Sequence, residues 1–114
     1  MVKQIPRSLL PDTVIYREKN EEDGFYGGNY KEDITLSYVR VDETSTYNQS
    51  NLSDGEKFSH LMFYDVVNSK ASDDFSFKVK SQVEWNNQML TVQKVNTLRT
   101  QFGRIHHYEL ELST

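Results

Sequence analysis

The chain has 114 residues, of which 36% are apolar and 26% charged, and its formal net charge at neutral pH is −4. This length suits a single domain, residues 1–114, with one hydrophobic core. The absence of cysteine excludes disulfide bonds and thiolate metal sites, and no apolar run approaches the roughly 20 residues of a membrane-spanning helix.

The first residues, MVKQIPRSLLPD, lack the pattern of a secretory signal peptide, because Pro6 and Pro11 interrupt a short apolar stretch. We therefore expect no membrane association and a location in the cytoplasm until the protein joins an assembly. The thirteen basic residues are scattered along the chain. A protein that binds DNA or RNA through phosphates needs a basic stripe, so this pattern argues against nucleic-acid binding.

Short segments of β type dominate the first half of the chain. One helical turn at residues 8–10 is followed by a predicted strand at 13–18 (TVIYRE) and a glycine-rich loop at 23–30 (DGFYGGNY). A second strand is predicted at 33–41, where the residues alternating on one face are Ile34, Leu36 and Tyr38. Val39 and Val41 then shift the apolar parity by one residue, which predicts a β-bulge or a strong bend.

A long polar segment, residues 42–57 (DETSTYNQSNLSDGEK), separates the two halves and is predicted to be a loop. Loops of this length are usually functional or mobile. The next segment, residues 58–67, is apolar on both parities. It is either a strand covered on both faces or a short helix.

The clearest predicted strand is residues 75–85, whose inward-facing residues are Phe75, Phe77, Val79, Val83 and Trp85. Asn86 and Asn87 then predict a two-residue hairpin turn, because asparagine tolerates the left-handed backbone. A return strand at 88–95 points Leu90 and Val92 inward. The last strand, at 104–112, has an inward face made of His106, Tyr108, Leu110 and Leu112.

Taken together, these elements predict an all-β protein with little helix. We expect a small antiparallel β-barrel or sandwich of about six strands that carries one long polar loop.

The histidines give no complete metal site. His106 and His107 are adjacent on a strand and should point to opposite faces, so a site would need His60 and a carboxylate such as Asp65 as well. We expect instead that His106 packs inside while His107 lies in solvent beside Glu109. No metal is predicted.

Catalytic signatures are also missing. The sequence has no cysteine nucleophile, no GxSxG elbow and no phosphate-binding loop, and most of its carboxylates lie in loop-type segments. We predict no catalytic residues and no cofactor.

Two segments offer residues for partner binding. The rings of the glycine-rich loop can stack on a base or a sugar or contact a protein, and polar loops commonly become ordered on a partner. The candidate residues are Phe25, Tyr26, Tyr30, Thr46, Tyr47, Asn48 and Asn51.

Four segments, LLPDTVIYRE, LMFYDVVNSKASDDFSF, VEWNNQMLTVQKV and GRIHHYELELS, carry a resemblance to a known family. The chain resembles the phage minor capsid proteins, also described as head–tail joining or head-completion (stopper-type) proteins. A W-N-G type turn usually joins two strands near the end of such proteins, and Asn87 stands here in place of the glycine.

The resemblance implies a small β-barrel that is monomeric when free and forms a homo-oligomeric ring in the neck of the virion. Its implied partners are the portal or connector proteins and the tail proteins, and DNA only passes through the channel that the ring helps to close. A long loop projects into the channel in related stoppers, and residues 42–57 are the candidate. Two alternatives remain open: an OB-like module for single-stranded nucleic acid or sugar, and a tail-terminator protein.

Overall fold

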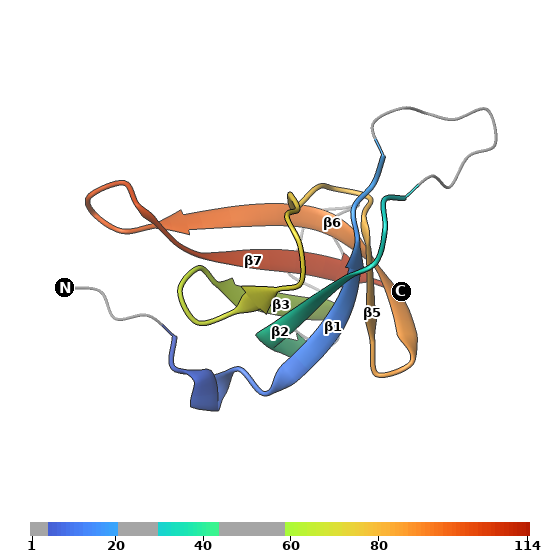
Figure 1. The fold of residues 1–114 in the computed structure, drawn as a ribbon, viewed down its shortest axis with the longest axis horizontal. Helices are drawn as coiled ribbons and strands as arrows, with labels where there is room; N and C mark the ends of the chain where they lie inside the picture. The colour runs from blue at the N-terminus through green and yellow to red at the C-terminus, as the bar shows by residue number, and fades with distance from the viewer. Residues whose placement is uncertain (1–4, 21–29, 44–58) are drawn as a thin grey trace.

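The computed structural model describes residues 5–20, 30–43 and 59–114 (Figure 1). A short 3-10 helix, Arg7–Leu9, precedes the first strand. The strands are β1 (Asp12–Arg17), β2 (Ile34–Glu43), β3 (His60–Asp65), β4 (Lys70–Ala71), β5 (Gln82–Trp85), β6 (Gln88–Arg99) and β7 (Ile105–Ser113).

Six of these strands close into an antiparallel barrel. They pair in the order β1-β5-β6-β7-β3-β2, and a further pairing of β1 with β2 completes the circle. The short strand β4 pairs with β2 outside the circle, at Leu36 and Ser37. The predicted small all-β fold is confirmed as a barrel with one extra strand.

Alternating side chains of the six strands fill the barrel. Successive residues of a strand point to opposite faces, so every second position is buried. The buried apolar cluster consists of Val14, Tyr16, Ile34, Leu36, Val39, Val41, Met62, Val83, Leu90, Val92, Leu110 and Leu112. The cluster includes Leu90 and Val92 of β6 and Leu110 and Leu112 of β7, as predicted. Of the other two inward positions predicted for β7, His106 is buried and Tyr108 is partly buried against the cluster.

The predicted parity shift in β2 is a β-bulge at Tyr38. Asp12 pairs with Val39 and Thr13 pairs with Ser37, so Tyr38 has no opposite residue in β1. Its φ of 58° lies in the left-handed region, which non-glycine residues seldom adopt. The Tyr38 side chain is consequently exposed, and its predicted place in the inward row is wrong.

The predicted strand at 75–85 is wrong in its first half, because only β5 is a strand. Lys80 has a φ of 74°, which turns the chain just before β5 begins. Val79 is exposed rather than inward, whereas Phe75 and Phe77 are half-buried against the core. An alternating apolar pattern predicted a continuous strand here. Among the described residues, however, 75–79 pair with no strand, and the bonds to β6 begin at Lys80, whose N–H donates to the Val92 carbonyl at 2.8 Å.

Three other predictions have clear outcomes. The hairpin turn is confirmed, since Asn86 and Asn87 have φ values of 51° and 64° between β5 and β6. The segment that was apolar on both parities forms strand β3, so the helical alternative is wrong. The polar loop begins later than predicted, because Asp42 and Glu43 belong to β2, and residues 44–58 lie outside the described part of the chain.

Candidate interaction surfaces

The structure describes one of the seven predicted partner-binding residues. Tyr30 is half-buried and forms an isolated bridge with Lys19, whose ammonium nitrogen lies 5.2 Å from the centre of the ring. One face of this ring is therefore covered by the protein's own cation. The other six residues, Phe25, Tyr26, Thr46, Tyr47, Asn48 and Asn51, lie outside the described residues.

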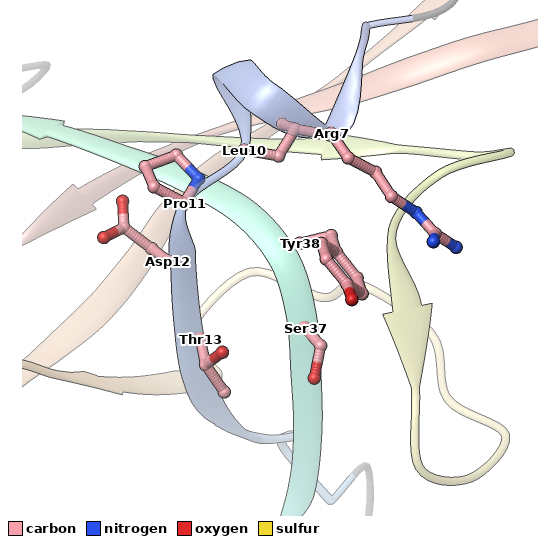
Figure 2. Close-up of a pocket in the computed structure, with 7 residues that line it drawn as sticks. All are labelled: Arg7, Leu10, Pro11, Asp12, Thr13, Ser37 and Tyr38. Carbon is pink, nitrogen blue, oxygen red and sulfur yellow. The ribbon is translucent and has the colours of Figure 1, made fainter.

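A hollow of about 380 Å³ lies beside the bulge in β2, and we call it the bulge hollow (Figure 2). Its lining residues are Arg7, Leu10, Pro11, Asp12, Thr13, Ser37 and Tyr38. The guanidinium carbon of Arg7 lies 4.4 Å from the centre of the Tyr38 ring. Asp12 accepts a hydrogen bond of 2.9 Å from the Val41 backbone N–H, so its carboxylate is already engaged.

The bulge hollow thus has a cationic and aromatic rim. Within the described ranges Arg7 makes no ion pair, and its planar guanidinium can bind a carboxylate or a similar anion. A polar or anionic group suits this hollow better than an apolar one.

A second hollow, of about 260 Å³, is lined mostly by aromatic and apolar side chains, and we call it the aromatic groove. It lies between the segment after β4 and the β6–β7 hairpin, and its residues are Phe75, Ser76, Phe77, Val95, Thr97 and Tyr108. The ring centres of Phe75 and Phe77 are 4.7 Å apart, and those of Phe77 and Tyr108 are 5.1 Å apart, both edge to face. Edge-to-face contacts are a favourable geometry for aromatic rings, so the groove is a preformed aromatic surface.

Two side chains of β1 and its C-terminal extension hold the wall of the aromatic groove in place. The Tyr16 hydroxyl donates to the Ser76 carbonyl (2.7 Å) and accepts from the Lys78 backbone N–H (2.9 Å). Glu18 accepts from the Ser76 backbone N–H at 2.6 Å. Side chains therefore satisfy the backbone groups that a neighbouring strand would otherwise pair, which explains the extended but unpaired course of this segment.

The Glu18 carboxylate is buried, with 3% of its side chain exposed, and forms ion pairs with Lys31 (2.9 Å) and Lys78 (3.0 Å). Burial alone would raise the pKa of Glu18. The hydrogen bonds from Lys31, the Ser76 N–H and Lys78 outweigh it and lower the pKa to about 2. The carboxylate is thus charged at neutral pH, and it holds Ser76 and Lys78 of the groove wall through a hydrogen bond and an ion pair.

The turn between β6 and β7 is the most exposed apolar feature of the described chain. Phe102 in this turn is 82% exposed. The turn is closed by backbone hydrogen bonds from Thr100 N–H to the Arg104 carbonyl (2.7 Å) and from Gly103 N–H to the Thr100 carbonyl (2.9 Å). Figure 1 shows this hairpin projecting past β3, so Phe102 stands at the end of an arm.

The adjacent histidines meet more closely than predicted. Their Nδ1 atoms are 2.8 Å apart, so one ring donates a hydrogen bond and the other must accept it. His107 contacts Glu109 through Nε2 at 2.8 Å, as expected, but only 14% of its side chain is exposed, so its predicted solvent position is wrong. Across residues 5–20, 30–43 and 59–114 no group of three or more possible metal ligands is found.

No helix in the described part of the chain is long and apolar enough to cross a membrane.

Comparison with known proteins supplies the decisive observation. Residues 6–112 match the family described as minor capsid protein. The chain belongs to the minor capsid protein family. No curated protein and no solved structure matches it.

Membership in the minor capsid protein family gives the chain a structural role in the phage particle, and it places the protein in the virion. The expected resemblance is confirmed at this level. A structural family also agrees with the prediction that the protein is not an enzyme.

Sequence reasoning missed the surfaces that suit such a role. Phe102 at the hairpin tip, with Arg99 and Arg104 beside it, was not singled out. The sequence TQFG did carry a signal, because a large aromatic residue stands next to a glycine between two predicted strands. The aromatic groove had no such signal, because three separate segments form it.

Proposed function

We propose that this minor capsid protein forms a ring in the head–tail connector of a tailed phage, where it helps to close the DNA channel and to join the tail. The observation that carries the proposal is the projecting β6–β7 hairpin with an exposed Phe102 on an otherwise closed barrel. Aromatic side chains contribute much of the energy of protein interfaces, and this one is held at the end of a hydrogen-bonded turn.

The closed barrel limits how copies can associate. Six strands pair with one another around the barrel, which removes most of the sheet edge available for strand addition. Association must therefore use projecting elements and surface hollows. The hairpin tip and the two hollows are different surfaces, and contacts between unlike surfaces generate rings when the rotation closes.

The charge of the chain suits passage of DNA rather than its retention. Each phosphate contact by a lysine or arginine adds affinity for DNA, and the net charge here is −4. A channel component with these properties offers DNA few adhesive sites. The partners in this proposal are the portal or connector proteins on one side and the tail proteins on the other, and the free chain is a monomer in the host cytoplasm.

Deletion of the gene from the producing phage tests this function. We expect heads that package DNA but lose it and carry no tails, examined by electron microscopy and by nuclease sensitivity of the DNA. Expression of the intact chain in trans should restore tailed particles. Heads that never package DNA, or normal infectious particles, would contradict the proposal, whereas tails of uncontrolled length on normal heads would indicate a tail terminator.

A further inference from the structure

The tip of the β6–β7 hairpin combines an aromatic ring with positive charge. Residues 99–104 contain Arg99 and Arg104 and no acidic residue, although the whole chain is acidic. Arg99 donates to the Gly103 carbonyl at 3.0 Å, and neither arginine makes an ion pair with the described residues. In sequence, Phe102 therefore lies between two arginines that have no acidic partner among the described residues.

Two acidic residues stand next to the aromatic groove in the chain. Asp73 and Asp74 directly precede Phe75, and both are exposed. Among the described residues, the one hydrogen bond that their side chains make is local, from the Asp74 N–H to the Asp73 carboxylate at 2.8 Å. An aromatic surface flanked by two available carboxylates complements an aromatic ring flanked by two arginines.

Charge also decides between the two hollows. The bulge hollow carries Arg7 on its rim, and its Asp12 carboxylate already accepts the Val41 N–H. A basic tip approaching that hollow would meet a like charge. The aromatic groove has no basic residue in its lining.

Size is compatible as well. A cavity of roughly 150 Å³ is sufficient to hold a benzene ring. The aromatic groove, at about 260 Å³, has room for the Phe102 ring. The rings of Phe77 and Tyr108 would offer it edge-to-face contacts.

The tip does not occupy the groove of its own chain. Thr97, which lines the groove, lies two positions before the end of β6 at Arg99. Strand residues advance about 3.3 Å each, so the turn begins roughly 7 Å farther out along the arm, and Phe102 in that turn is 82% exposed. The groove must receive the tip of another copy.

We propose that the Phe102 tip of one copy inserts into the aromatic groove of its neighbour, with Arg99 and Arg104 facing Asp73 and Asp74. The contact is heterologous, so repetition of it builds the ring, and it rests on the function proposed above. One side chain in a groove of about 260 Å³ is a small contact, so we expect free copies to stay apart and to associate only on their template.

Cross-linking in purified phage particles tests the contact directly. The chain has no cysteine, so Gln101→Cys at the tip and Ser76→Cys in the groove can be introduced together on a clean background. A bis-maleimide reagent should link the double variant into a ladder of dimers, trimers and larger species on a denaturing gel. Each single variant should remain a monomer.

Charge reversal in the double-cysteine variant tests whether the arginines of the tip pair with the aspartates beside the groove. Arg104→Glu should reduce the ladder at least tenfold, and adding Asp74→Arg should restore it. Arg7→Glu, the matched change at the bulge hollow, should leave the ladder intact.

The outcomes separate the contact from the function. If the double variant stays monomeric in particles that contain the chain, the proposed contact is wrong but the ring is not. This holds whether the tip then contacts another protein or nucleic acid. Loss of the ladder with Arg7→Glu would also overturn it. Absence of the chain from particles that are otherwise complete overturns both.

Discussion

At neutral pH the Glu18 carboxylate is ionised although its side chain is buried, and this has a consequence for acid stability. Its pKa in the folded chain is about 2, below the ordinary value of 4.5. A lowered pKa means that the folded state binds the proton less readily than the unfolded chain does. The stabilisation is therefore complete above pH 4.5 and is lost as the pH falls toward 2, and it amounts to roughly 3 kcal/mol.

We predict that Glu18→Gln lowers the free energy of unfolding at pH 7 by roughly 2–3 kcal/mol, because Lys31 and Lys78 lose their buried partner. Urea denaturation at several pH values should show the difference from the wild type shrinking toward zero near pH 2. Glu32→Gln is the matched control, since Glu32 is exposed, and it should change little. A difference that persists unchanged at low pH would contradict this role for Glu18.

Trp85 tests the packing at the end of the barrel. It is half-buried against the core, and its ring lies edge to face with His60 at a centroid distance of 5.4 Å. Truncation of a fully buried tryptophan costs about 3–5 kcal/mol, so we predict about 2–3 kcal/mol for Trp85→Ala. Trp85→Phe keeps an aromatic ring and should cost less. A melting temperature unaffected by Trp85→Ala would show that the ring contributes no packing.

At the scale of elements, the hairpin β5–β6 was predictable because its determinants are local. Asn86 and Asn87 follow an alternating strand, and both adopt positive φ values as the turn requires. Glycine adopts this conformation with the least strain. Asn87 stands where we expect glycine in related proteins, so a glycine at this position should stabilise the fold.

We predict that Asn87→Gly raises the free energy of unfolding by about 0.5 kcal/mol, and that Asn87→Ala lowers it by about 1 kcal/mol. Chemical denaturation of both variants measures the two effects, and the denaturant slope should not change. If the glycine variant is less stable than the wild type, the Asn87 side chain itself stabilises the turn, and the prediction is wrong.

The segment at 75–81 could not be predicted, although its apolar alternation was clear. Its backbone groups are bound by Tyr16 and Glu18, which lie about 60 positions earlier in the chain. Periodicity reports which side chains are buried and not which groups pair with the backbone. The alternation correctly placed Phe75 and Phe77 near the core and wrongly implied a strand.

At the scale of the whole molecule, the fold class followed from the sequence but closure of the barrel did not. Alternating strands and turn residues favour an all-β fold, whereas the pairing of β1 with both β2 and β5 joins distant segments. The aromatic groove depends on the same long-range contacts, since Phe77, Val95 and Tyr108 come from separate segments. The family was recognisable in the sequence, but the surfaces that serve assembly required the structure.

We propose above that this minor capsid protein is a ring component of the phage neck. Quantitative mass spectrometry of purified particles tests it most directly, with the copy number calibrated against the portal protein. We expect one copy of the chain per portal subunit, or half that number. Absence of the chain from particles that contain every other structural protein, or a copy number matching that of the major shell protein, would contradict it.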